Sequence, residues 1–293
     1  MSSPIVSVII PCYNAEDYIE ETVQSVVDQS YQNIEIIVVN DGSTDNSLKI
    51  IRGLESKHSQ IIVISQSNNG VSYARNRGFE RATGEFICFL DSDDTWLSGW
   101  VEKMVNYLLE NENIGLAHSD VEIIDHNSNR TGSYQRGKGG FLLESLLKWD
   151  SDNFHTPSNK MVRRKVIDKV GGFEEELSTS ADQEFLFRVA HQYEIGRFPE
   201  VLCLYRIHDN NMHSNIEKME TDHLLAYKKT EKNGLFKSLK FRNMCFSNLY
   251  MILGFTWFKG DNVLRGLYYI AKSIFIYPPN ISKPLNKLKS LLS

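Results

Sequence analysis

The stretch Phe86-Ile-Cys-Phe-Leu-Asp-Ser-Asp-Asp94 guides the interpretation of the whole chain, because five apolar residues lead directly into three carboxylates. An uninterrupted apolar run of this length is typical of a strand covered on both faces, as in α/β proteins. The acids then stand at the carboxyl end of the strand, where ligands bind in open parallel sheets. Clustered carboxylates repel one another unless a cation or hydrogen-bond donors compensate. Oxygen ligands suit Mg²⁺ or Mn²⁺, so the sequence predicts a divalent-cation site here.

Helix capping offers a second explanation for part of this acidic group. Asp94 or Thr95 could cap a helix that begins near Trp96, because short polar side chains and acids stabilise helix N-termini. Asp91 and Asp93 precede that helix and are therefore the better candidates for binding a ligand.

Composition places the chain among globular proteins of a reducing compartment. Its 293 residues are 41% hydrophobic, enough for a core in one large domain or in a domain with an appendage. The four cysteines are widely spaced and form no Cys-x-x-Cys pair, which indicates small buried side chains and not a disulfide framework or zinc site. No basic segment followed by an apolar run opens the sequence, so we expect no secretory signal.

The net charge of −5 conceals a division between the two ends of the chain. From Leu224 onward there are 12 Lys and Arg residues against 2 acidic ones, a net charge of +10, whereas residues 1–223 carry −15. An acidic body with a basic, aromatic tail predicts that the tail meets an anionic surface, either a membrane or a polyanion.

Predicted strands and helices alternate from the start of the chain. Runs of β-branched and aromatic residues mark four strands, and helical periodicity marks a segment between each of them and the next. Such alternation predicts a parallel, doubly wound sheet with right-handed crossovers. The four predicted strands are Ile5–Ile10, Ile34–Val39, Ile61–Ile64 and Phe86–Leu90.

Polar residues follow three of these strands and should meet at one edge of the sheet. Tyr13 and Asn14 follow the first strand, Asp41 follows the second, and Asp91 and Asp93 follow the fourth. Because the strands are parallel, one crevice at their carboxyl ends collects these side chains. The first loop lacks the Gly-x-Gly-x-x-Gly pattern of dinucleotide folds, and the sequence has no Gly-x-x-x-x-Gly-Lys-Ser/Thr phosphate loop.

Four motifs in a fixed order give the chain a family resemblance. Together they resemble the family 2 glycosyltransferases, which use a nucleotide-diphosphate sugar and have the GT-A fold, a Rossmann-like, mostly parallel α/β sheet flanked by helices. The resemblance spans Ile5 to His208 and implies a GT-A domain over residues 1–222, with a helical appendage over residues 223–293. The motifs are Val8-Ile-Ile-Pro-Cys-Tyr-Asn14, Val39-Asn-Asp-Gly-Ser-Thr-Asp45, Asn69-Gly-Val-Ser-Tyr-Ala-Arg-Asn-Arg-Gly78 and Phe89-Leu-Asp-Ser-Asp-Asp94.

The resemblance implies a nucleotide pocket at the ends of the first two strands. Asp41 would accept a hydrogen bond from a uracil ring, and Arg75 would lie near the base and the phosphates. Each has a simpler alternative, since Asp41-Gly42 is a good turn by itself, Arg75 could lie on a helix surface, and Tyr13 could pack in the core. The residues implied in donor binding are Pro11, Tyr13, Asn14, Asp41, Asn69, Gly70, Arg75, Asp91 and Ser92.

A metal site is also implied, with Mg²⁺ or Mn²⁺ bound by Asp93 of the Asp-x-Asp motif. His208 ends the segment Tyr205-Arg-Ile-His208, which is similar to a Tyr-Arg-x-His segment of the family and would place this imidazole by the metal or the diphosphate. A single histidine is more often structural, so the alternative for His208 is a packed side chain.

A general base is expected at the start of a helix capped by Ser180, with Asp182 and Glu184 in its first turn. Side chains two apart on a helix point in different directions, so only one of these carboxylates should enter the site. The resemblance selects Asp182, which would remove the proton from the acceptor hydroxyl. Ala181 stands where the family usually has Glu, and the alternative for both acids is a favourable interaction with the helix dipole.

A polar segment between residues 127 and 140 is the candidate for contact with the acceptor. It is rich in Asn, Ser, Gly and Arg, which predicts a mobile loop or, alternatively, a solvated loop without a contact. Arg130, Arg136 and Lys138 are its candidates for binding anionic groups.

The basic tail contains apolar and aromatic segments that charged residues interrupt. Its longest apolar run is far below the ~20 residues that span a bilayer. An amphipathic helix in the membrane plane fits this pattern, with rings at headgroup level and lysines reaching anionic lipid. The alternatives are a helical lid on the catalytic domain or a homodimer contact. The rings are Trp257, Tyr268, Tyr269 and Tyr277, and the lysines are Lys283, Lys287 and Lys289.

These observations predict an inverting, metal-dependent glycosyltransferase, cytoplasmic and peripheral at the inner face of the plasma membrane. It would move single sugars from a UDP-sugar to a hydroxyl of a lipid-linked saccharide in bacterial surface-polysaccharide biosynthesis. Single additions are expected because the Gln-x-x-Arg-Trp motif of processive members is absent. The alternatives are a sugar nucleotidyltransferase and a non-catalytic nucleotide-sugar-binding assembly subunit, and we expect no nucleic-acid partner.

Overall fold

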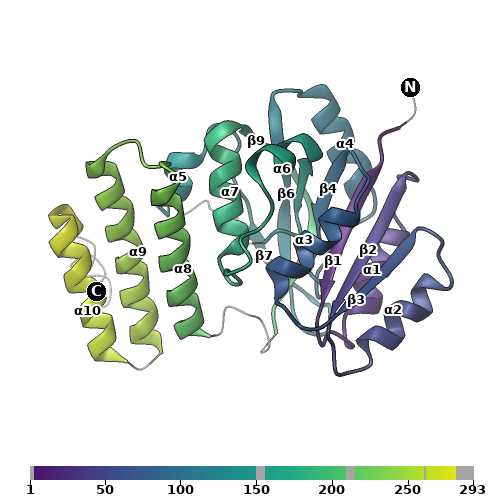
Figure 1. Ribbon diagram of the computed structural model, residues 1–293, viewed down its shortest axis with the longest axis horizontal. Coiled ribbons are helices and arrows are strands. Elements are labelled where there is room, and N and C mark those ends of the chain that lie inside the picture. The colour runs from purple at the N-terminus through teal and green to yellow at the C-terminus, as the bar shows by residue number, and fades with distance from the viewer. Residues whose placement is uncertain (1–2, 150–155, 209–214, 261, 282–293) are drawn as a thin grey trace.

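The computed structural model describes residues 3–149, 156–208, 215–260 and 262–281. Its centre is a nine-stranded sheet in the order β3-β2-β1-β4-β8-β6-β9-β5, with β7 paired to β6 (Figure 1). The strands are β1 (Val6–Cys12), β2 (Ile34–Asp41), β3 (Ile61–Gln66), β4 (Phe86–Phe89), β5 (Thr95–Trp96), β6 (Ile114–Ile124), β7 (Arg130–Gln135), β8 (Lys160–Arg163) and β9 (Glu194–Arg206).

Six of the nine strands run in the same direction, which aligns their carboxyl ends. β1 pairs in parallel with β2 and β4, and β2 pairs in parallel with β3. β8 is antiparallel to both β4 and β6, so β6 has the direction of β4, and β9 is parallel to β6. The predicted mostly parallel α/β sheet is confirmed, and all four predicted strands are present.

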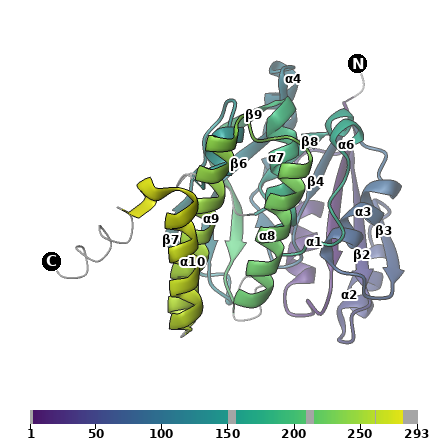
Figure 2. The same cartoon turned by 60° about the vertical axis from the view of Figure 1, so that its left-hand side comes forward.

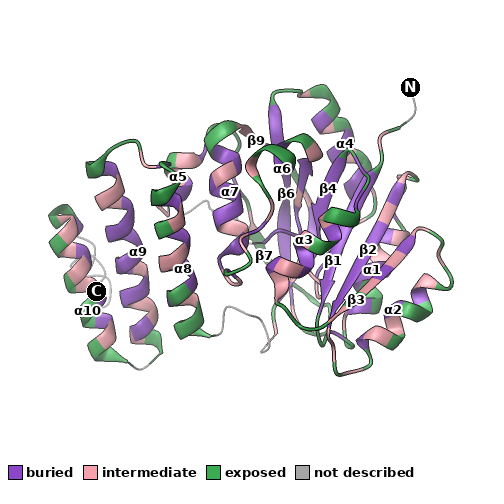
Figure 3. Ribbon diagram, in the orientation of Figure 1, coloured by how far each residue is buried: buried purple, intermediate pink, exposed green. Residues whose placement is uncertain are grey.

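Helices cover both faces of the sheet because successive strand residues point in opposite directions. Ile9 packs in one apolar cluster with α3, α6 and α7, whereas Val8 and Ile10 pack in a second cluster with α1, α2 and α4. The central strands are therefore buried, as their purple colour in Figure 3 shows. The helices are α1 (Ile19–Val27), α2 (Ser47–Glu55), α3 (Val71–Arg81), α4 (Trp100–Glu110), α6 (Arg164–Val170) and α7 (Ala181–Gln192).

A glycine sets the distance between α3 and β1. A Cβ atom at Gly78 would lie 2.3 Å from Cγ2 of Ile9, so any larger residue would push the helix away from the sheet. The position of α3 matters for the site, because the same helix carries Arg75.

Three helices, α8, α9 and α10, form a row beyond α7 at one end of the molecule (Figure 1, Figure 2). Tyr227 of α8 and Phe246 of α9 belong to the same buried cluster as Ile9 of the sheet. The domain boundary expected between residues 222 and 223 falls inside α8, and the apolar core continues across it. The remaining helices are α5 (Leu143–Leu147), α8 (Ile216–Lys232), α9 (Leu239–Lys259), α10 (Val263–Ile276) and a 3₁₀ turn, Pro278–Ile281.

Two of the rings expected at a membrane surface are buried, so the prediction was wrong for them. Trp257 is 6% exposed and donates from Nε1 to Glu220, and Tyr269 is 4% exposed. Tyr268 is 57% exposed, and Tyr277 is partly buried. In the described chain we find no helix with the length and apolar character that a bilayer crossing requires. Lys283, Lys287 and Lys289 lie outside the described residues.

The segment that follows the acidic group is not the predicted helix. Trp96 belongs to the short strand β5, and α4 begins only at Trp100. Asp94 is buried and does not cap α4, because its carboxylate accepts from Ser158 Oγ at 2.5 Å and from the Arg206 backbone N–H at 2.9 Å. These partners lie 64 and 112 positions away in the sequence, so a local capping rule could not reveal them.

Much of the segment expected as a mobile loop forms the strand β7, which pairs antiparallel with β6. Arg130 binds Glu122 at 3.0 Å, and Arg136 lies 3.9 Å from Asp120. The mobile-loop prediction was therefore wrong over residues 130–135. Two of its three candidate anion-binding cations already face carboxylates of the same hairpin.

Candidate active site

The carboxyl ends of β1, β2, β4 and β9 bring most of the predicted site residues to one edge of the sheet. These strands lead into Tyr13, Asp41, Asp91 and His208, respectively. The parallel arrangement causes this convergence, since each strand delivers its next residues to the same side. Asp182 joins them from the first turn of α7.

Asp41 ties the end of β2 to the start of α3. One carboxylate oxygen accepts from the Asn69 N–H at 2.9 Å and from Gln66 Nε2 at 2.8 Å, and the other accepts from the Gly70 N–H at 2.8 Å. Gly70 has φ +91°, a conformation that L side chains rarely adopt, so glycine suits this turn. Asp41 is 3% exposed, and its observed role is to shape the loop before α3.

Asn14 shapes the loop after β1. Its φ of 47° lies in the left-handed region, which asparagine tolerates better than most residues. Asn14 Oδ1 accepts from the Thr44 N–H at 2.8 Å, which links this loop to the loop after β2. Pro11 is buried within β1, whereas the Tyr13 ring is 50% exposed and is available to a ligand.

Arg75 and Asp91 form an ion pair of 2.6 Å between Nη2 and Oδ1. Arg75 is 4% exposed, its guanidinium lies 5.1 Å from the Phe173 ring, and its Nε has no hydrogen-bond partner in the described part of the chain. Burial raises the pKa of Asp91 above its usual range, and the Arg75 guanidinium opposes that rise. Asp93 and Asp182 add to the rise, which places all three carboxylates in one electrostatic neighbourhood.

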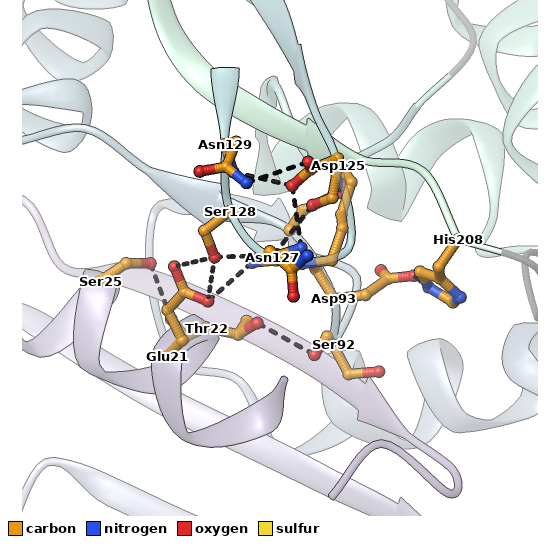
Figure 4. A network of polar contacts seen from close by, with 12 residues as sticks. Glu21, Thr22, Ser25, Ser92, Asp93, Asp125, Asn127, Ser128, Asn129 and His208 are labelled. Atoms are coloured by element: carbon orange, nitrogen blue, oxygen red, sulfur yellow. Dashed lines mark hydrogen bonds and ion pairs between the residues drawn. The ribbon is translucent and has the colours of Figure 1, made fainter. Parts of the chain in front are cut away.

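Asp93 lies beside His208, and the two side chains face one another in Figure 4. Asp93 Oδ2 is 2.9 Å from His208 Nε2, and the His208 ring centroid lies 5.0 Å from that of Tyr18, with the two rings tilted by 31°. Thr22 Oγ1 donates to the Ser92 carbonyl at 3.0 Å and so fixes the turn between Asp91 and Asp93. The two residues predicted to bind a metal are therefore adjacent, although they come from different strand ends.

This pair suits a divalent cation only together with a ligand. No group of three or more His, Cys, Asp or Glu side chains that could hold a metal occurs among the described residues. One carboxylate and one imidazole, completed by phosphate oxygens, are a donor set that Mg²⁺ or Mn²⁺ accepts. Asp93 and His208 thus fit a cation that arrives with, or is completed by, a diphosphate.

Arg206 organises this corner, and we assigned it no role from the sequence. It is 1% exposed, and it donates from Nε to the Asp93 carbonyl at 2.8 Å and from Nη2 to Glu21 at 2.7 Å. Its Nη1 donates to Ser128 Oγ at 2.8 Å, and Figure 4 shows Ser128 above Glu21. A buried arginine that joins three segments holds the backbone of the acidic turn in place.

Ser158 is a second residue that sequence reasoning left without a role. Its Oγ accepts from the Asp91 N–H at 3.1 Å and donates to Asp94. Burial raises the pKa of Asp94 well above its usual range, and Asp93 and Asp91 reinforce this. The Thr-Pro-Ser segment before β8 was the available signal, but its partners follow the neighbouring strand β4 and lie 67 and 64 positions away in the sequence.

Asp182 lines a small cavity of about 20 Å³ with Lys160, and the rest of the lining is largely apolar. Ser180 is the N-cap residue of α7, as predicted, although its hydroxyl makes no capping bond. Glu184 points elsewhere, because it is buried and binds Arg188 at 2.7 Å. Of the two acids in this turn, Asp182 alone lines the cavity, and its role as a base stays a prediction.

The chain belongs to glycosyl transferase family 2, whose model matches residues 7–171. It is 33% identical over 228 residues to an uncharacterized glycosyltransferase of Haemophilus influenzae, an alignment that covers 74% of this chain and 71% of that protein. Over 108 residues it is 46% identical to Bacillus subtilis TuaG, whose name assigns it to teichuronic acid biosynthesis. That alignment covers 36% of this chain and 43% of TuaG.

Solved structures confirm the GT-A fold. The S. aureus TarS structure in complex with UDP-GlcNAc matches with a TM-score of 0.63 at 20% identity, over 93% of this chain and 89% of that one. The Pyrobaculum calidifontis mannosyltransferase PcManGT, in complex with GDP-Man and Mn²⁺, matches with a TM-score of 0.65 at 18% identity, over 99% and 81%. The chain is therefore a GT-A glycosyltransferase of family 2.

Proposed function

We propose that this glycosyltransferase inverts the anomeric centre and transfers one sugar per encounter from a UDP-sugar to a hydroxyl of a lipid-linked saccharide. The observation that carries the proposal is the position of Asp182, which shares an electrostatic neighbourhood with Asp91 and Asp93 at the edge of the sheet. Glu184 is bound to Arg188, so the first turn of α7 presents one carboxylate to the cavity. One base and no neighbouring nucleophile in this turn favour a single displacement over a two-step reaction.

In this mechanism Asp182 accepts the proton of the acceptor hydroxyl as its oxygen attacks the anomeric carbon. The nucleotide lies over the loops after β1 and β2, where Tyr13 is exposed and Asn14 and Asp41 shape the walls. Asp41 Oδ1 already accepts two hydrogen bonds, whereas Oδ2 accepts one and retains capacity for another, so acceptance from uracil by Oδ2 remains a prediction. Arg75, paired with Asp91, would lie near the base and the phosphates.

Asp93 and His208 would hold the Mg²⁺ or Mn²⁺ that accompanies the diphosphate. When bound, such an ion offsets the charge that develops on the departing UDP. Support comes from the adjacency of the two side chains and from the Mn²⁺ in the related mannosyltransferase structure.

The acceptor is proposed to sit in a membrane, because α10 carries an apolar face that the described residues leave exposed. This face, together with a tail of net charge +10, suits an anionic lipid surface. The name of TuaG supports surface-polysaccharide biosynthesis and hence the cytoplasmic face of the plasma membrane. The exposed residues of the face are Val263, Leu264, Leu267, Tyr268 and Phe275, and Ile281 of the following 3₁₀ turn is also exposed.

The test is release of UDP from a panel of UDP-sugars, with Mn²⁺ or with EDTA, using a bacterial lipid extract as the acceptor. We expect release from one UDP-sugar with Mn²⁺ and none with EDTA, while GDP-mannose serves as the control donor. Release of GDP from GDP-mannose, without release of UDP from any UDP-sugar, would contradict the uridine assignment. Equal rates in EDTA would contradict the metal assignment.

A further inference from the structure

An antiparallel strand delivers a cation to the acidic edge of the sheet. β8 runs against β4, so its first residue, Lys160, lies at the carboxyl end of β4, and on its other side it pairs with His118 in the middle of β6. Met161 pairs with Cys88, three positions before Asp91. The chain reversal therefore puts a lysine where the parallel strands put acids.

Lys160 and Asp182 line the same cavity of about 20 Å³, which leaves room for about one water molecule. Most other lining residues are apolar, and among them are the rings of Phe89, Phe173 and Phe185. In such surroundings two charges interact more strongly than they do in bulk water. Lys160 is anchored by donating from Nζ to the Thr156 carbonyl and to Asn159 Oδ1.

We propose that Lys160 is a positioning residue for the transfer reaction, because its positive charge lines the same cavity as the Asp182 carboxylate, attracts it and orients it toward the acceptor. The proposal rests on the proposed role of Asp182 as the base. Lys160 itself is not required to touch the substrate.

Electrostatics agree with this assignment. Burial lowers the pKa of Lys160 to about 8, and Asp182 is the strongest of the charges that oppose the fall. The ammonium is therefore mostly charged at neutral pH and loses its proton just above pH 8. The titratable and charged groups of this neighbourhood are Arg75 on α3, Asp91 after β4, His118 on β6, Asp182 on α7, and Cys203 and Tyr205 on β9.

The experiment compares the pH dependence of kcat/KM in the wild type, Lys160→Met and Lys160→Arg, with donor affinity measured in parallel. Lys160→Met removes a positive charge near the Asp182 carboxylate. The acid limb of the kcat/KM profile should therefore move up by about one pH unit, and kcat/KM at pH 7 should fall about tenfold. Donor affinity should change less than twofold. Lys160→Arg keeps the charge at all pH values, so it should retain activity and move the basic limb near pH 8 upward.

Lys165→Met is the matched control, since Lys165 is an exposed lysine of α6, and it should leave the profile unchanged. A wild-type acid limb in Lys160→Met, or a wild-type basic limb in Lys160→Arg, would overturn the proposal. If Lys160→Met does not fold, as shown by circular dichroism, the Lys160→Arg result decides. Full activity of Asp182→Asn would instead overturn the base assignment, so the two failures are distinguishable.

Discussion

The edge of the sheet and the C-terminal helices differ in how their side chains are partnered. At the edge, Asp41, Asp91 and Asp93 are each held by donors from distant parts of the chain before any ligand arrives. On α10, Leu264 and Phe275 are 82% and 87% exposed and project apolar surface into solvent. A preorganised polar edge suits positioning of a charged donor, whereas an uncovered apolar face suits contact with a less specific surface. Under the proposed function, catalysis belongs to the first region and membrane contact to the second.

The largest effect should come from the edge. Asp182→Asn removes the proposed base, so kcat should fall by ~10²–10⁴ while the dissociation constant for UDP stays within twofold. Single-turnover kinetics and calorimetry would measure the two quantities. Asp168→Asn, on the exposed side of α6, is the control. Parallel loss of UDP binding would show that Asp182 holds the donor.

A core residue tests whether the two regions are thermodynamically separate. Trp257→Ala should lower the free energy of unfolding by about 3–5 kcal/mol, because it leaves a cavity and removes one of the hydrogen-bond donors to Glu220. One apolar cluster joins both regions, so thermal unfolding should remain a single transition with a lower midpoint. Phe275→Ala, at an exposed site, should change the free energy by less than about 0.5 kcal/mol. Two separate transitions would support the predicted boundary at residue 222.

The metal site should show a smaller, conditional effect. Asp93→Asn should weaken UDP binding in Mn²⁺ by about 10–100-fold, because a neutral amide is a poorer ligand than a carboxylate. In EDTA the variant and the wild type should bind UDP with similar affinity. Asp17→Asn, an exposed acid near α1, controls for the change in net charge. A defect of equal size in EDTA would mean that Asp93 acts without a metal.

The smallest effect on catalysis should come from α10. The double change Leu264→Ser and Phe275→Ser should reduce co-sedimentation with anionic liposomes about tenfold or more, since apolar burial contributes about 1.5–3 kcal/mol per side chain. UDP release with a soluble acceptor should be unaffected. Leu109→Ser, at an exposed position of α4, is the control and should co-sediment with the liposomes as the wild type does. If the double variant has half the molecular mass of the wild type in solution but co-sediments with liposomes as the wild type does, this face is the contact of a homodimer.

Local patterns predicted the sheet and its polar edge correctly. Apolar runs identified β1 to β4, and their exits placed Asp41, Asp91 and Asp93 at one edge of the sheet, because strand direction and residue order are enough to place strand ends. The same reasoning failed at Asp94, Trp257 and β7. Each of these depends on a partner from another part of the chain, and a hydropathy pattern does not name that partner.

The sequence by itself determined the family, the parallel sheet and the acids at its carboxyl edge, since these follow from local periodicity and motif order. Only the tertiary structure decided how the edge is held. Arg206 reaches Glu21 across 185 positions, and Ser158 reaches Asp91 across 67. The tertiary structure also buries Trp257 and brings Lys160 and Asp182 to the lining of one cavity. These outcomes depend on which surfaces pack together, because burial and charge pairing are properties of the folded neighbourhood and not of a segment.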